Sequence, residues 1–181
     1  PHDISVILML LNEIPERIFA TGGSYLQRKV TDVTVTTMDF KDGVKAHIFV
    51  SWLHPFKEQK LIVVGDKKMA VFDDVSKEKL FLYPHKIDWK DRIPVVTKSD
   101  AEVVSFDTTQ EPLKAECSHF LECIEKNQKP KTDGAEGLNV LKVLSSCQES
   151  LNKSGCVVLL DGTETKGHYA HPSAFIDEDV T

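Results

Sequence analysis

The densest run of β-branched and aromatic residues lies between positions 32 and 75. Within it, residues 32–40 and 44–53 flank Lys41-Asp42-Gly43, and residues 60–64 and 69–72 flank a polar turn. Asp and Gly tolerate the positive φ that a tight hairpin turn needs. The pattern therefore predicts three or four consecutive antiparallel strands.

Both faces of the predicted sheet carry apolar residues. Val33, Val35, Ala46, Ile48, Val50 and Trp52 could line one face, and Met38, Phe40, Phe49 and Leu53 the other. A sheet with one wet face alternates more cleanly. We therefore expect helices on one face and a second subunit on the other. A mixed surface with scattered apolar residues stays open as the alternative.

Helical spacing of apolar residues appears in three segments, at positions 4–11, 113–124 and 141–151. Asp3 is the expected N-cap of the first, Pro112 suits the first turn of the second, and Asp133 with Glu136 has capping-box spacing before the third. Gly155 is placed to end that last helix.

Further short strands are expected at positions 18–21, 79–83, 95–97, 102–106 and 156–160, with a turn at 22–24 and irregular chain at 84–94. The order of helix, strands, two helices and a last strand predicts an α+β fold. We expect a largely antiparallel open sheet with helices on one face.

Composition and charge exclude several classes of protein. The chain has 181 residues and a formal net charge of −6, and its Lys and Arg residues form no basic stripe of the kind that binds nucleic acid. No apolar run approaches a membrane span and no signal peptide is present, so we expect a cytoplasmic protein. The four cysteines lack Cys-x-x-Cys spacing and are expected to be reduced thiols. They are Cys117, Cys123, Cys147 and Cys156.

Several segments together resemble one enzyme family. Pro1-His2-Asp3-Ile4-Ser5 before an apolar helix is similar to the family's Asp-x-Gly-x-His-x-x-Asp segment. The other matching segments are 51–58, Val64-Gly65, 70–74, and Pro112-Leu113 with Glu116, Phe120 and Pro130. The family is the glucose–fructose oxidoreductase, inositol dehydrogenase and rhizopine-catabolism group, Gfo/Idh/MocA. The resemblance covers roughly residues 1–161, as the C-terminal domain.

The resemblance implies an enzyme that oxidises a sugar or cyclitol hydroxyl with NAD or NADP. In this family the cofactor is held by an N-terminal Rossmann domain, and the C-terminal domain shapes the sugar site and builds oligomers through its open sheet. The implied fold is like the C-terminal domains of dihydrodipicolinate reductase and glyceraldehyde-3-phosphate dehydrogenase. The chain begins with proline directly before a helix and contains no Gly-x-Gly-x-x-Gly segment. We therefore expect a fragment that lacks the Rossmann domain, binds no cofactor and is inactive by itself.

The same resemblance names His2 as the catalytic residue, while Ser5 stands where the family often has its second Asp. An imidazole that titrates near neutral pH can accept the proton of a hydroxyl as the hydride leaves. The alternative reading of His2 is a residue that merely precedes a helix.

Substrate contacts are expected around the end of the strand at 44–53. Lys57 could bind a carboxylate or phosphate, with a solvated loop lysine beside Glu58 as the alternative. His54 and Trp52 are the further candidates, although Trp52 could instead belong to the core. No metal site is expected, since four ligands are typical of zinc and the remaining histidines have no such company. They are His47, His85, His119, and the pair His168 and His171.

Residues 1–166 are thus expected to form the substrate-binding and oligomerisation domain. Residues 167–181 resemble the opening of a left-handed β-helix of hexapeptide-repeat acyltransferases, with an ordinary polar terminus as the alternative. A dehydrogenase fused to an acyltransferase suggests a nucleotide-sugar substrate. The competing function is a non-catalytic module that assembles or binds through its sheet. The expected partners are a sugar or nucleotide sugar and further copies of the chain, without nucleic acid or membrane.

Overall fold

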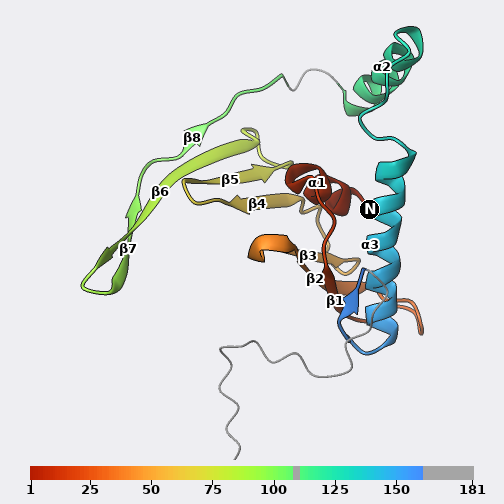
Figure 1. Cartoon of the computed structure of the whole chain (residues 1–181), viewed down its shortest axis with the longest axis horizontal. Coiled ribbons are helices and arrows are strands. Elements are labelled where there is room, and N and C mark those ends of the chain that lie inside the picture. Colours follow the sequence, from red (N-terminus) through yellow and green to blue (C-terminus); the bar gives the residue numbers. More distant parts are fainter. Residues whose placement is uncertain (108–110, 161–181) are drawn as a thin grey trace, which may run out of the picture. The chain divides into compact units, whose positions relative to one another are not determined.

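The computed structural model describes residues 1–107 and 111–160, so the acyltransferase resemblance at 167–181 lies outside the described residues. The chain divides into two compact units. Figure 1 draws the helices and strands of both. The first contains Pro1–Leu53 and the described residues from Lys129 onward; the second contains His54–Gln128. Each unit is described by itself.

The first unit joins both ends of the described chain in one antiparallel sheet. Its helices are α1 (His2–Leu11) and α3 (Gly134–Asn152), and its strands are β1 (Arg17–Gly23), β2 (Val33–Asp39), β3 (Lys45–Ser51) and β9 (Val158–Leu159). The strand order is β3-β2-β1-β9. A short 3-10 turn, η1 (Lys41–Gly43), joins β2 to β3. Asp42 and Gly43 have φ values of 60° and 81° there, which confirms the predicted hairpin turn.

The core of this unit lies between the sheet and the two helices. Ile18, Ala20 and Met38 have 0% exposure on one face of the sheet, and α3 packs against β1 and α1. The helices contribute Ile4, Ile7, Leu8, Val140, Val143 and Cys147 to the same cluster. Full burial of one such side chain contributes about 1.5–3 kcal/mol. The predicted α+β fold, with helices on one face of an antiparallel sheet, is confirmed.

The register divides the apolar residues of the sheet differently from the prediction. Met38 pairs with Ala46 on the helix-covered face, whereas Val35 pairs with Phe49 on the opposite face. Grouping Val35 with Ala46 was therefore wrong. In β2 and β3, even-numbered residues pair with even-numbered residues, and odd-numbered residues with odd-numbered ones. This register is set by the turn between the strands and not by the alternation within either strand.

The helix ends follow the sequence signals in part. Pro1 is the N-cap of α1 without a side-chain hydrogen bond, so the prediction that Asp3 caps this helix was wrong. Asp133 caps α3 by accepting hydrogen bonds from the backbone N–H groups of Ala135 (3.0 Å) and Glu136 (2.9 Å). Gly155 follows α3 with φ 85°, in the left-handed region that suits glycine at a helix end.

The second unit holds a separate sheet. Its strands are β4 (Lys60–Val64), β5 (Lys68–Asp73), β6 (Leu80–Lys90), β7 (Ile93–Lys98) and β8 (Glu102–Val103). The order is β4-β5-β6-β7, with β8 also paired to β6, and all pairs are antiparallel. The strands between 32 and 75 are thus consecutive and antiparallel, as predicted, but they belong to two sheets.

Two local predictions were wrong, one for segment 84–94 and one for Gly22 and Gly23. The segment 84–94 is regular, because β6 continues to Lys90 and turns at Asp91 and Arg92, which have φ values of 50° and 64°. Two positive φ values in a two-residue loop are typical of the tight turns of β-hairpins. Gly22 and Gly23, expected in a turn, instead end β1.

The helix α2 (Pro112–Glu125) begins at proline, as predicted. Its apolar stripe, however, is exposed in this structure, and Cys123 is the buried residue of the helix. The exposed members of the stripe are Leu113, Phe120, Leu121 and Ile124.

Candidate functional site

An open groove lies between the start of α1 and the first half of α3, within the first unit. His2 and Ser5 border it from α1, and Glu136 borders it from α3. The remaining lining is mostly small or apolar: Pro1, Thr132, Gly134, Gly137, Leu138, Val140, Leu141 and Leu144. The groove therefore joins an imidazole, a hydroxyl and a carboxylate to an apolar floor.

The polar side of the groove is fixed by a hydrogen bond between the helices. The Ser5 hydroxyl donates to Oε1 of Glu136 at 2.7 Å, across 131 residues of sequence. Ser5 lies three residues after His2, and residues three apart share one face of a helix. Glu136 lies in the first turn of α3, where the Asp133 cap fixes the backbone.

His2 is exposed at the first position of α1 and lines this groove. No hydrogen bond or ion pair joins its ring to another residue of the described chain. A neutral imidazole in such a place can accept a proton from a bound hydroxyl group. The structure thus places the predicted catalytic residue in a groove with two further polar groups.

Sequence reasoning identified Glu136 as part of a helix cap and missed its place in the groove. The capping-box spacing is present, but the Glu136 carboxylate bonds to Ser5 on another helix. No local signal in the sequence connects positions 5 and 136.

Trp52 follows β3 in the first unit, and its side chain is 84% exposed. Its backbone N–H donates to the carbonyl of Asp32 at 2.9 Å, which ties the end of β3 to the start of β2. The expectation that Trp52 could be a core residue was therefore wrong. An exposed indole at a strand end remains a candidate for contact with a ligand.

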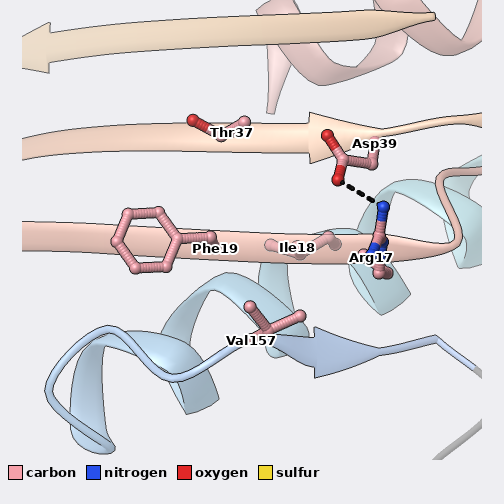
Figure 2. A pocket seen from close by; sticks show the side chains of 6 residues that line it. All are labelled: Arg17, Ile18, Phe19, Thr37, Asp39 and Val157. Atoms are coloured by element: carbon pink, nitrogen blue, oxygen red, sulfur yellow. Dashed lines mark ion pairs between the residues drawn. The ribbon is translucent and has the colours of Figure 1, made fainter. Parts of the chain in front are cut away.

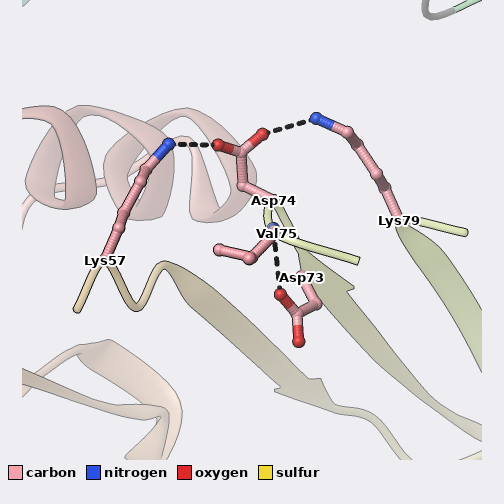
Figure 3. A network of polar contacts seen from close by, with 5 residues as sticks. All are labelled: Lys57, Asp73, Asp74, Val75 and Lys79. Atoms are coloured by element: carbon pink, nitrogen blue, oxygen red, sulfur yellow. Dashed lines mark hydrogen bonds and ion pairs between the residues drawn. The ribbon is translucent and has the colours of Figure 1, made fainter. Parts of the chain in front are cut away.

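Lys57 lies in the second unit and is held by an aspartate (Figure 3). Its Nζ is 2.6 Å from Oδ2 of Asp74, and Nζ of Lys79 is 2.7 Å from Oδ1 of the same residue. These hydrogen bonds, with Lys57 first and Lys79 second, lower the pKa of Asp74 to about 2. Asp74 therefore anchors the Lys57 loop next to the start of β6.

His54, the other predicted contact in this loop, is close to an acidic neighbour. Its Nδ1 is 3.7 Å from Oε2 of Glu58, and its ring centroid is 5.9 Å from that of Phe56. His54 and Lys57 thus share a short loop of the second unit, whereas His2 and Trp52 belong to the first.

A second, small pocket lies at the ends of β1 and β2 and was not predicted (Figure 2). Its volume is about 30 Å3, close to the space of one water molecule. Nη2 of Arg17 is 3.0 Å from Oδ2 of Asp39, and Nζ of Lys45 is 2.5 Å from Oδ1. Phe19, Thr37, Ile18 and Val157 complete the lining. The pocket is too small for a sugar.

Metal and thiol chemistry find little support in the described residues. Among residues 1–107 and 111–160, no group of three or more His, Cys, Asp or Glu side chains is placed to hold a metal ion. All four cysteines are free. Burial raises the pKa of the Cys147 thiol, which makes it a poor nucleophile.

None of the described helices combines the length and apolar character that a membrane span requires.

Comparison with protein families and solved structures supports the resemblance seen in the sequence. Residues 1–71 match the family model described as the GFO/IDH/MocA C-terminal domain. No curated protein matches the sequence. This match confirms the predicted resemblance to a Gfo/Idh/MocA C-terminal domain for residues 1–71.

Three solved structures show the likeness of the fold. UDP-N-acetylglucosamine 3-dehydrogenase from Acidithiobacillus ferrooxidans is 19% identical with a TM-score of 0.69, over 84% of this chain and 45% of its own. A putative NADPH-dependent oxidoreductase from Desulfitobacterium hafniense is 20% identical with a TM-score of 0.65. The match covers 88% of this chain and 46% of that protein. The WlbA dehydrogenase from Bordetella pertussis, solved with NADH and UDP-GlcNAcA, is 17% identical with a TM-score of 0.62. The match covers 87% of this chain and 42% of that protein.

These relatives establish the fold, and the chain spans less than half the length of each of the three.

Proposed function

We propose that this chain, whose first 71 residues match the GFO/IDH/MocA C-terminal domain, is the substrate-binding and oligomerisation part of an NAD(P)-dependent dehydrogenase. The proposed reaction is the oxidation of a sugar hydroxyl, with a nucleotide sugar as the expected substrate. The observation that carries the proposal is His2 at the start of α1, in one groove with Ser5 and Glu136.

The chemistry of the groove suits this reaction. Oxidation of a carbinol removes a hydride from carbon and a proton from oxygen, and the His2 imidazole is the proposed acceptor of that proton. When bound, the nicotinamide supplies the hydride acceptor. The sequence contains no Gly-x-Gly-x-x-Gly segment, so we assign NAD or NADP to a domain outside these 181 residues.

The nucleotide sugars named for two structural relatives support the choice of a nucleotide sugar as substrate. One is a UDP-N-acetylglucosamine 3-dehydrogenase, and another was solved with NADH and UDP-GlcNAcA. For Lys57, His54 and Trp52, we propose contacts with the polar part of such a substrate. In the case of Lys57, this requires that the substrate's anionic group compete with Asp74 for the ammonium group.

The open face of the first sheet favours assembly as the second role. Phe19, Val35 and Phe49 are exposed on the face opposite the helices, at 39%, 42% and 56%. We propose that a second copy of the chain covers this face. A module that only assembles or binds through its sheet, without catalysis, is the competing function and rests on the same face.

The full-length protein that contains this chain tests the proposal. NAD or NADP reduction is followed at 340 nm with UDP-N-acetylglucosamine and its uronic acid as substrates. We expect His2→Ala to lower turnover about a hundredfold, and His2→Asn to fail as well, because an amide cannot accept the proton. Absence of reduction with all nucleotide sugars would favour the assembly module. Near-normal turnover of His2→Asn would assign the proton to another group.

A further inference from the structure

The Glu136 carboxylate is only partly used by the protein. Oε1 accepts the hydrogen bond from the Ser5 hydroxyl, whereas no hydrogen bond or ion pair in the described chain involves Oε2. An ionised carboxylate has about four acceptor positions, so one bond leaves most of its capacity open. The side chain is half-buried and lines the groove that also contains His2.

The position of Glu136 is held firmly by its surroundings. Its backbone N–H donates to Oδ1 of Asp133 at 2.9 Å. Its carboxylate Oε1 accepts from the Ser5 hydroxyl at 2.7 Å. The carboxylate can therefore receive a hydrogen bond from a ligand without first being ordered.

A sugar carries both C–H groups and hydroxyl groups, and the lining of the groove offers contacts to both. Val140, Leu141 and Leu144 offer an apolar floor for C–H groups, while His2 and Glu136 flank Ser5 with polar atoms. Because His2 and Glu136 line the same groove, a sugar with one hydroxyl at His2 can present another hydroxyl to Glu136. Hydrogen bonds to a charged acceptor are stronger than those to a neutral one.

We infer that Glu136 is a substrate-binding residue that accepts a hydrogen bond from a second hydroxyl of the sugar whose first hydroxyl faces His2. The inference rests on the proposed function, since it takes the hydroxyl at His2 as the reacting one. It assigns Ser5 the role of holding the carboxylate in place.

The charge of Glu136 can be separated from its structural role by the choice of variant. Glu136→Gln keeps a side-chain oxygen that can accept from Ser5 but removes the charge. Ser5→Ala removes the bond between the helices and keeps the charge. Glu149→Gln is the matched control, because Glu149 lies near the other end of α3, where it pairs with Lys153 at 2.9 Å.

Calorimetric binding to the full-length protein provides a test that does not depend on turnover. The probes are UDP-N-acetylglucosamine and UDP, which lacks the sugar. We expect Glu136→Gln to weaken binding of the sugar nucleotide about ten- to hundredfold, while UDP binding and the control variant stay unchanged. Ser5→Ala should give a smaller loss for the same probe.

The outcomes distinguish this inference from the proposed function. Unchanged affinity of Glu136→Gln, an equal loss for UDP, or no binding of the sugar nucleotide by the parent protein would each overturn the role of Glu136. Charge-dependent binding of the sugar without any NAD(P)H formation would support a hydrogen bond from the sugar to Glu136 and would overturn the dehydrogenase.

Discussion

The hydroxyl of Ser150 accepts a hydrogen bond from the backbone N–H of Ala20 at 2.9 Å and donates one to the carbonyl of Cys156 at 2.6 Å. Ser150 is fully buried near the end of α3, and Ala20 lies in the middle of β1. One small side chain thus connects the long helix to the sheet and to the segment that leads into β9. The connection holds the end of α3 against β1 across 130 residues of sequence.

Ser150→Ala should destabilise the protein by about 1–3 kcal/mol, because it leaves a buried backbone N–H and a carbonyl without their partner. Urea unfolding followed by circular dichroism measures the loss. Ser145→Ala, at an exposed position of the same helix, is the control and should stay within about 0.5 kcal/mol of the parent. Equal effects of the two variants would show that water replaces the Ser150 hydroxyl.

Two methionines test where the core of the first unit lies. Met38 in β2 has 0% exposure and Met9 in α1 has 68%. Met38→Ala should cost about 2–5 kcal/mol through lost burial and the cavity left behind, whereas Met9→Ala should be close to neutral. Thermal and urea unfolding of both variants compares them. A large loss for Met9→Ala would mean that the outer side of α1 is covered.

Asp74 provides a prediction about pH. Hydrogen bonds from Lys57 and Lys79 lower its pKa from 3.8 to about 2. Because the folded pKa is lowered, the stabilisation from these pairs is fully present above pH 3.8 and is lost as the pH falls toward 2. Carbon-13 NMR titration of the carboxyl group measures the midpoint. We expect Lys57→Met and Lys79→Met each to raise it, and an unchanged midpoint in both would contradict the ion pairs.

The elements of the fold were largely predictable because their signals are local. The Asp42-Gly43 turn, the Asp133 cap and the proline at the start of α2 each depend on a few adjacent residues. The hairpin at Asp91 and Arg92 was missed because these residues adopt positive φ without glycine.

The candidate site was predictable only at His2, through the resemblance to a family. Glu136 reaches Ser5 across 131 residues, and the α1–α3 packing that brings them together has no counterpart in either local pattern. The pairing of Val35 with Phe49 was missed for a related reason, because it depends on register rather than on the alternation within one strand.

The cysteines should differ in their reactivity with a thiol reagent. Cys117 and Cys156 are exposed, whereas Cys147 is buried and its pKa is raised by that burial. We expect Ellman's reagent at pH 8 to modify the two exposed thiols first and Cys147 only when the protein unfolds, since the thiolate is the reactive form. Mass spectrometry of peptides identifies the modified positions. Early modification of Cys147 would show that the core between α3 and β2 opens readily.

The open face of the first sheet leads to the last prediction. Val35 lies opposite Phe49 in the register, and Phe19 on β1 lies on the same face. At one end of this face, Asp39 forms ion pairs with Arg17 and Lys45, so the apolar residues have a charged border.

A two-fold contact through such a face would place the aromatic residues of both copies at its centre, where truncation or charge costs most. Phe49→Lys should therefore weaken self-association about tenfold to a hundredfold, as measured by sedimentation equilibrium at micromolar concentration. Val50→Lys is the matched control, because Val50 follows in the same strand and points to the opposite face. A parent protein that is monomeric throughout the range, or a larger effect of Val50→Lys, would show that a second copy does not cover this face.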